Sequence, residues 1–216
     1  MAQSPSHIAS IRKDYQLAAL DEELVGTDPL LFFNQWFEEA VEARVGEVNA
    51  FTLGTVDELC RPHARIVLLK GIDQGGFVFY TNYKSSKGKH IETNPFASMV
   101  FFWQELERQV RVEGRVEKVS PEESDAYFSS RPEGSQLGAW SSPQSQEISM
   151  RTMLDDEYQQ YLQTYAGKTI PRPPHWGGYR VLPDLIEFWQ GRSNRMHDRI
   201  KFQLGQTGWQ KARLAP

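Results

Sequence analysis

The sequence of 216 residues has one cysteine, Cys60, so no disulfide can form within the chain and no metal site can be built from several cysteines. It has no apolar run near the ~20 residues of a membrane span and no signal-peptide pattern, so we expect a cytoplasmic protein. Basic residues show no excess, since 24 Lys and Arg face 28 Asp and Glu and give a net charge of -4. Proteins that bind nucleic acid usually carry a basic excess, so we expect no nucleic-acid partner. Any bound anion must be held by a local cluster of donors.

Common catalytic motifs are also missing. The chain contains no GxSxG, HExxH, Walker A or strand-following GxGxxG pattern. Its five histidines lack metal-ligand spacing, and we expect no metal; they are His7, His63, His90, His175 and His197. A protein without its own nucleophile or metal, but with clusters of anion donors, would need a cofactor to carry its chemistry.

Hydrophobic periodicity predicts a mainly β protein with helices, of the α+β class. Residues 1–27 are polar and lack a sustained period, and we predict a mobile N-terminal arm there and a single domain over residues 28–216. Helices are expected from 28 to about 46, over 85–94, from a capping box at 120 to about 130, and over 150–166. Strands are expected over 50–56, 64–70 (buried), 77–81, 97–103, 108–119, 179–181 and 209–214, with a hairpin turn over 73–76 and a turn over 132–134. About seven strands joined by short turns favour an antiparallel barrel over βαβ units.

The stretch 188–199 is interpreted as a turn that leads into a strand. Alternation places Arg195, His197 and Arg199 on one face beside Trp189. It predicts a second, core-facing set: Met196, Asp198, Ile200, Phe202 and Leu204. The cationic face suggests a site for a planar anion. The alternative is a solvated strand face with ordinary surface arginines.

Two further clusters each suit one phosphate. The first combines Arg65 and Lys70 with Tyr80-Thr81 and the helix start at Ser85-Ser86-Lys87. Alternation puts Arg65 and Lys70 on opposite strand faces, so they serve different ligands or a bulge brings them together. The second cluster is Tyr127, Arg131 and Ser135. The alternative for this cluster is an ordinary helix C-terminus, in which the arginine interacts favourably with the helix dipole and the serine is a turn residue.

Several motifs together resemble one family. They are Arg65–Lys70, Phe79–Asn82, Glu107–Val110, Ser130–Pro132 with Ser135–Trp140, Trp176–Gly178, Glu187–Gly191 with Arg195–Arg199, and Arg213–Pro216. From about residue 12 to the end, the chain resembles the pyridoxine/pyridoxamine 5′-phosphate oxidases. The block 187–199 is highly specific.

The resemblance implies an antiparallel, FMN-binding split β-barrel that forms a homodimer with FMN at the subunit interface. It implies oxidation of pyridoxamine or pyridoxine 5′-phosphate to pyridoxal 5′-phosphate by O2, with release of H2O2, and of NH3 from the amine. The implied FMN contacts are Arg65, Ile66, Val67, Leu68, Leu69, Lys70, Tyr80, Thr81, Ser86, Lys87, Gln109, Gln144 and Ser145, with Trp189 and Arg199 reaching the flavin from the partner chain. At Ser86 the family often has arginine, so one phosphate contact lacks a charge.

The same resemblance implies a substrate site. The implied phosphate contacts are Lys70, Tyr127, Arg131 and Ser135, while Arg195 and His197 lie over the pyridine ring as the catalytic pair. Arg12, Lys13, Asp14 and Tyr15 match a segment that closes over the substrate. Two alternatives remain: a flavin-binding barrel or flavin reductase with another substrate, and a non-enzymatic module that sequesters a phosphorylated ligand.

Overall fold

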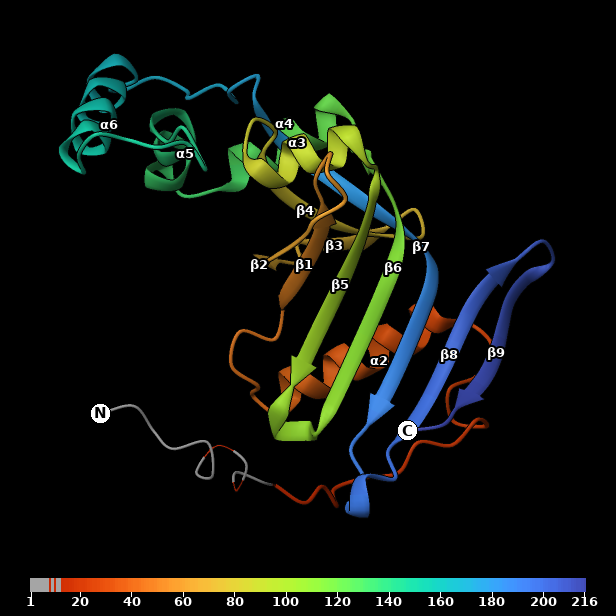
Figure 1. Cartoon of the computed structure of the whole chain (residues 1–216). Coiled ribbons are helices and arrows are strands. Elements are labelled where there is room, and N and C mark those ends of the chain that lie inside the picture. The colour runs from red at the N-terminus through yellow and green to blue at the C-terminus, as the bar shows by residue number, and fades with distance from the viewer. Residues whose placement is uncertain (1–7, 9, 11–12) are drawn as a thin grey trace. The chain divides into compact units, whose positions relative to one another are not determined.

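The computed structural model describes residues 8, 10 and 13–216, and its elements are drawn in Figure 1. These residues form two compact units, each assembled from separate segments. Unit 1 comprises residues up to 48, 100–112 and 185–216, and unit 2 comprises 49–99 and 113–184. Strands β5 (Phe96–Trp103), β6 (Arg108–Lys118) and β7 (Trp176–Gln190) contribute residues to both. The mobile arm and the single domain over 28–216 stay predictions.

The seven-strand path of the sheet, which lies mostly in unit 2, has the strand order β2-β1-β5-β6-β7-β4-β3. Its remaining strands are β1 (Ala50–Val56), β2 (Pro62–Leu68), β3 (Gly71–Asp73) and β4 (Gly76–Asn82). The pairings β1–β2, β3–β4 and β4–β7 are antiparallel. Gln74 and Gly75 both have positive φ, at 45° and 78°, as a two-residue hairpin turn requires, so the predicted hairpin is confirmed.

Strand β2 differs from its prediction as a buried strand over 64–70. It begins at Pro62, because the carboxylate of Asp57 accepts the backbone N–H groups of Leu59 and Arg61 and closes the turn early. The strand is not buried, and the Ile66 side chain is 64% exposed. β2 stands at one end of the strand order and pairs with β1 alone, so one edge has no neighbour within residues 13–216.

The helices of unit 2 are α3 (Ser86–Thr93), α4 (Pro121–Ser130), α5 (Glu133–Ser141) and α6 (Thr152–Thr164). Ser85 caps α3 at the predicted helix start, and the predicted capping box of Ser120 and Glu123 at α4 is confirmed. Helix α5 is the exception, because a turn was predicted over 132–134. α5 lies side by side with α6 (Figure 1).

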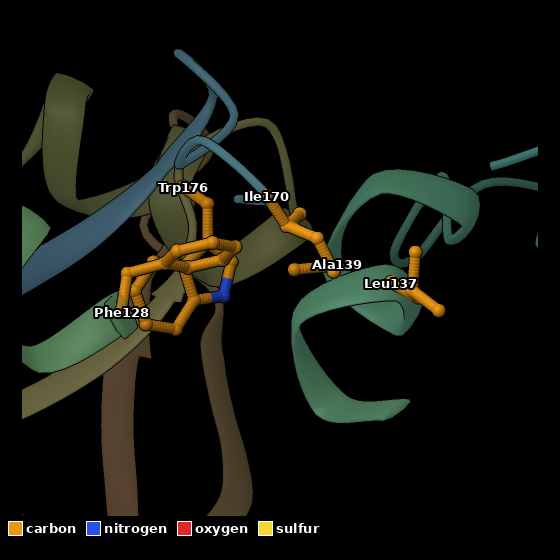
Figure 2. Close-up of a cluster of buried hydrophobic side chains, with 5 residues drawn as sticks. All are labelled: Phe128, Leu137, Ala139, Ile170 and Trp176. Atoms are coloured by element: carbon orange, nitrogen blue, oxygen red, sulfur yellow. The ribbon is translucent and has the colours of Figure 1, made fainter. Parts of the chain in front are cut away.

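A cluster of buried side chains explains α5. Leu137 and Ala139 of the helix belong to one core cluster with Phe128, Ile170 and Trp176, drawn in Figure 2. In that view Trp176 lies against Phe128, and Ile170 extends toward Ala139. Tertiary burial therefore stabilises a helix whose sequence has too few apolar positions for a clear period.

Unit 1 contains α2 (Pro29–Glu42), β8 (Asp198–Gly205) and β9 (Gly208–Leu214). The Asp28 carboxylate caps α2 at the N–H groups of Leu30 and Leu31, so the helix begins where the sequence predicted, but it ends at Glu42 instead of near residue 46. Residues 13–27 contain no helix or strand. No helix among the described residues is long and apolar enough to cross a membrane.

The predicted alternation over 195–204 is only partly right. Ile200 and Phe202 are fully buried, but Met196 and Leu204 are exposed. Strand β8 begins at Asp198, and residues 193–195 form a short 3-10 turn in which Asn194 and Arg195 have positive φ. Left-handed residues break the two-residue alternation, so Arg195 and Met196 do not take the faces that the sequence predicted.

Candidate functional site

A cavity of about 670 Å³ in unit 2 brings both predicted phosphate clusters together. Eleven of its lining residues were predicted as site residues: Ile66, Val67, Leu68, Lys70, Tyr80, Thr81, Lys87, Tyr127, Arg131, Ser135 and Gln144. Lys70 lines this cavity and Arg65 does not. The two clusters thus form one site with two sets of donors.

The first set centres on a buried lysine. The Lys87 ammonium donates to Thr81 Oγ1 at 3.1 Å, Ser85 Oγ at 3.3 Å and Gln144 Oε1 at 3.2 Å. Burial, and then the neighbouring charge of Arg65, lower the pKa of Lys87 to about 8. All three of these partners are neutral, so they leave the ammonium charge uncompensated. A buried cation held in this way is prepared to accept an anion.

Arg65 turns toward its own sheet. Its Nη1 donates to the Leu53 carbonyl at 3.1 Å, to Thr55 Oγ1 at 2.7 Å and to the His63 carbonyl at 3.3 Å. Burial lowers the pKa of Arg65. Within unit 2, three other predicted FMN contacts also do not line the cavity: Leu69 is buried, and Ser86 and Ser145 are exposed.

The second set centres on the half-buried side chain of Arg131. Arg131 lies over the Trp176 ring, with its Cζ atom 4.6 Å from the ring centroid. Its Nη1 is buried and has no hydrogen-bond partner within the part of the chain that the structure describes. Burial lowers the pKa of Arg131. An unpaired buried nitrogen of a cation, beside a cavity that also holds Ser135 and Tyr127, indicates a place for an anionic ligand.

An aromatic wall borders this second set. The rings of Tyr80 and Tyr127 stack with centroids 3.9 Å apart, and Tyr80 stacks on Trp176 at 5.6 Å. Burial, with smaller contributions from the Glu123 and Asp73 carboxylates, raises the pKa of Tyr80 to about 12, so its hydroxyl stays neutral. Flat rings beside cationic donors suit a planar phosphorylated molecule.

A second cavity, of about 470 Å³, lies in unit 1. It joins the predicted N-terminal segment to the predicted catalytic pair, and its lining residues are Lys13, Asp14, Tyr15, Arg192, Asn194, Arg195 and His197. Arg12 lies outside the described residues. The His197 ring lies 4.6 Å from the Trp189 ring, and its Nδ1 accepts the Arg192 N–H at 3.1 Å. In the neutral imidazole the proton is therefore on Nε2.

Two family descriptions match most of the chain. Residues 37–165 match "Pyridoxamine 5′-phosphate oxidase", and residues 176–216 match "Pyridoxine 5′-phosphate oxidase C-terminal dimerisation region". The chain belongs to the pyridoxine/pyridoxamine 5′-phosphate oxidase family. The family prediction from the sequence is thus confirmed.

Curated members of the family are similar over nearly their full length. The chain is 56% identical to the pyridoxine/pyridoxamine 5′-phosphate oxidase of Acaryochloris marina, over 97% of this chain and 95% of that protein. It is 55% identical to the enzyme of that name from Cupriavidus necator, over 98% of this chain and all of that protein.

Solved structures share the fold. PhzG from Burkholderia lata, in complex with tetrahydrophenazine-1-carboxylic acid, has a TM-score of 0.87 at 28% identity, over 93% of this chain and all of that chain. An FMN-binding protein from Nostoc punctiforme related to pyridoxamine 5′-phosphate oxidase has a TM-score of 0.71 at 16% identity, over 88% and 100% of the two chains. The predicted antiparallel, FMN-binding split barrel is confirmed.

Three residues that the family resemblance assigns to FMN lie in unit 1 and line neither cavity: Gln109, Trp189 and Arg199. The Arg199 Nε donates to Glu187 at 2.8 Å, and its Nη1 donates to the Ala215 carbonyl at 2.9 Å. The hydrogen bond that Arg199 donates to the Glu187 carboxylate raises the pKa of Arg199. The contact of Trp189 and Arg199 with a partner's flavin stays a prediction.

Sequence reasoning missed several lining residues. In unit 2 they are Asn82, Pro132, Gly138, Ala139, Ser142 and Trp176, and in unit 1 they are Arg192 and Asn194. Four of the first group lie in α5 or at its ends, so recognising that helix would have found them. Trp176 appeared in the Trp-Gly-Gly motif of the family resemblance, but no role was assigned to it.

Proposed function

We propose that this protein oxidises pyridoxamine 5′-phosphate and pyridoxine 5′-phosphate to pyridoxal 5′-phosphate, using FMN as cofactor and O2 as electron acceptor. Near-full-length identity of about 55% to enzymes of that name supports the activity. Members of this family use FMN. The observation that carries the proposal is the single cavity with two cationic donor sets, one at Lys87 and one at Arg131.

The residues of the cavity fit two phosphorylated ring molecules. We assign the FMN phosphate to Lys87, Thr81 and the start of α3, where a buried ammonium has only neutral hydrogen-bond partners. The positive charge of the neighbouring Arg65 adds to the attraction for the FMN phosphate. The rest of the FMN set comprises Ile66–Lys70, Tyr80, Ser86, Gln109, Gln144, Ser145, Trp189 and Arg199.

The substrate's phosphate is assigned to Tyr127, Arg131 and Ser135, together with Lys70. The buried and unpartnered Nη1 of Arg131 supports this assignment, because a dianionic phosphate supplies the acceptor that it lacks. The aromatic wall beside it is suited to exclude water from a bound ring.

The second cavity supplies the groups that act on the substrate ring. FMN, when bound, accepts the two electrons that leave the C4′ carbon of the substrate and passes them to O2. Arg195 holds the substrate ring in place. His197 orients the ring or moves a proton through Nε2, since its Nδ1 is occupied by the Arg192 N–H. Lys13, Asp14 and Tyr15 close over the substrate.

The active form is proposed to be a homodimer with FMN at the subunit interface. Residues 176–216 match a dimerisation region, which supports a dimer. The exposed Ile66 on β2, next to the cavity residues Val67 and Leu68, supports an interface at the FMN site, because apolar side chains there would be covered by a partner.

Colour gives the first test. The purified protein should be yellow and should bleach on anaerobic addition of pyridoxamine 5′-phosphate, with pyridoxal 5′-phosphate and H2O2 formed after air is admitted. A yellow protein that does not bleach would support a flavin-binding barrel with another substrate. A colourless protein that cannot take up FMN would support a non-enzymatic binding module.

A substitution tests the catalytic assignment. Arg195→Leu should lose most of its turnover while its affinity for FMN is unchanged. Unchanged turnover in this variant would refute the role given to Arg195.

A further inference from the structure

Glu107 occupies an unusual position in unit 1. It lies in the turn between β5 and β6 with φ 54° and ψ 39°, in the left-handed region that glycine and asparagine adopt most easily. Its side chain is nevertheless buried, with 3% of its surface exposed. A buried carboxylate on a left-handed residue costs stability twice, so its contacts must offset that cost.

Those contacts attach the N-terminal segment. Glu107 Oε2 accepts the backbone N–H groups of Gln16 at 2.8 Å and Leu17 at 3.1 Å. Its Oε1 lies 3.6 Å from the Lys13 ammonium. One carboxylate therefore binds three groups within five consecutive residues.

The backbone of Glu107 binds the end of β7. Its carbonyl oxygen accepts the Gly191 N–H at 2.7 Å and the Gln190 side-chain amide at 3.2 Å. The same residue thus connects the segment at 13–17 with the end of β7, from which the chain continues to Arg195 and His197.

This arrangement fixes the position of Tyr15. A Cβ atom added to Gly191 would lie 2.7 Å from Tyr15 Cγ, so the ring packs directly on the glycine. The Tyr15 ring also lies 5.8 Å from the Trp189 ring and 6.0 Å from the His197 ring. Without the carboxylate, the N–H groups of Gln16 and Leu17 would have to find water, and Tyr15 would lose its anchor.

We infer that Glu107 is a positioning residue for the oxidase reaction, which holds segment 13–17 against the cavity of Arg195 and His197 so that it is ready to close on the substrate. This inference rests on the proposed function. Its expected signature is a change in substrate affinity rather than in turnover, because preorganisation lowers the entropy that binding must otherwise cost.

The test uses the FMN-loaded, full-length protein. In Glu107→Ala the KM for pyridoxamine 5′-phosphate should rise about tenfold, equal to about 1.4 kcal/mol, while kcat changes little. Glu107→Gln should recover most of the affinity, because the amide oxygen can accept both N–H groups. The matched control is Glu105→Gln, an exposed residue of the same turn, which should behave as the wild type.

Hydrogen exchange provides a readout independent of activity. The amides of Gln16 and Leu17 should exchange about tenfold faster in Glu107→Ala and at nearly the wild-type rate in Glu107→Gln. If the alanine variant does not fold, Glu107→Asp replaces it, since its carboxylate is one methylene shorter and cannot reach both N–H groups. A Tyr15→Ala, Glu107→Ala double variant should show a KM no higher than the larger single effect.

The outcomes separate the two proposals. Unchanged exchange at Gln16 and Leu17 in the alanine or aspartate variant overturns the inference, whatever the activity. A joint loss of kcat, FMN and stability without recovery by glutamine also overturns it, because Glu107 would then serve folding alone. If the wild type does not oxidise the substrate, the proposed function fails, and the exchange rates alone decide whether Glu107 holds the segment.

Discussion

Replacing Arg131 by methionine should separate ligand binding from folding stability. In the substrate-free protein the Arg131 side chain is half-buried and its Nη1 atom is buried without a partner, which costs about 1–3 kcal/mol of stability. Methionine removes that cost and keeps much of the apolar stem. It also removes the cation–π contact with Trp176, a loss of about 1–2 kcal/mol. The two terms oppose each other and are similar in size.

The melting temperature of substrate-free Arg131→Met should therefore stay within about 4 °C of the wild type, because 1 kcal/mol moves Tm by about 2–4 °C in a chain of this length. Substrate binding should change much more. Losing a charge-assisted bond to a phosphate costs about 3 kcal/mol, which raises the KM for pyridoxamine 5′-phosphate roughly 150-fold.

The assay pairs steady-state kinetics, followed by pyridoxal 5′-phosphate absorbance, with thermal unfolding of the FMN-loaded protein. Arg151→Met, at an exposed arginine, is the control and should alter neither quantity. FMN loss in Arg131→Met would mean that the two phosphate sites are exchanged. A drop in Tm of 10 °C or more with little change in KM would refute the reasoning, since the arginine would then be structural.

Three further predictions concern charge and packing in unit 2. Lys87 is charged below its pKa of about 8 and neutral above it, so the Kd for FMN should rise with pH above 8, approaching tenfold per pH unit in fluorescence titrations; a pH-independent Kd would exclude the lysine from the phosphate site. Arg180→Met leaves three partly exposed carboxylates without their shared partner and should lower the unfolding free energy at pH 7 by about 3 kcal/mol in urea. Because that arginine lowers the pKa of Asp73, the difference from wild type should shrink as pH falls through the lowered pKa; a constant difference would contradict this. Gly114→Ala puts a Cβ atom 2.0 Å from a backbone carbonyl of β7 and should lower the unfolding free energy by about 3 kcal/mol. Gly138→Ala has open space around its Cβ atom and should leave the unfolding free energy unchanged. Equal stability of the two variants would show that the sheet backbone moves to accept the added Cβ atom.

Local signals in the sequence predicted the elements that local chemistry determines. Asp28, Ser85 and the pair Ser120 and Glu123 mark helix starts through their own side-chain hydrogen bonds, and each cap is present in the structure. The hairpin turn at Gln74-Gly75 is equally local. These features need no knowledge of distant parts of the chain.

The errors occur where the structure does not follow from the local sequence pattern. Helix α5 depends on burial against Phe128 and Ile170, and its own sequence gives no clear period. The start of β8 depends on two residues in the left-handed conformation, Asn194 and Arg195, and their sequence matches no recognised turn motif. Strand alternation was extended across them and misplaced Met196.

The residues of the candidate site were also predicted only in part. Chemical type alone identified Lys87, Arg131 and Ser135 as anion donors, and the structure gathers all three in one cavity. The chemical type of a residue did not predict where its side chain points, since Arg65 donates to residues of its own sheet. The predicted roles of these residues stay predictions until ligands are measured.

Trp176 is shared between the ligand cavity and the folded core. It packs on Phe128 in the interior. At the cavity, the Arg131 guanidinium lies over its ring and the Tyr80 ring stacks on it. Mutations that reshape this wall to admit a bulkier substrate would also loosen the interior, so selection for new specificity should accept changes near Ser135 and Ser142 before it accepts changes at the tryptophan. Laboratory evolution that starts from a stabilised parent would relax this restriction.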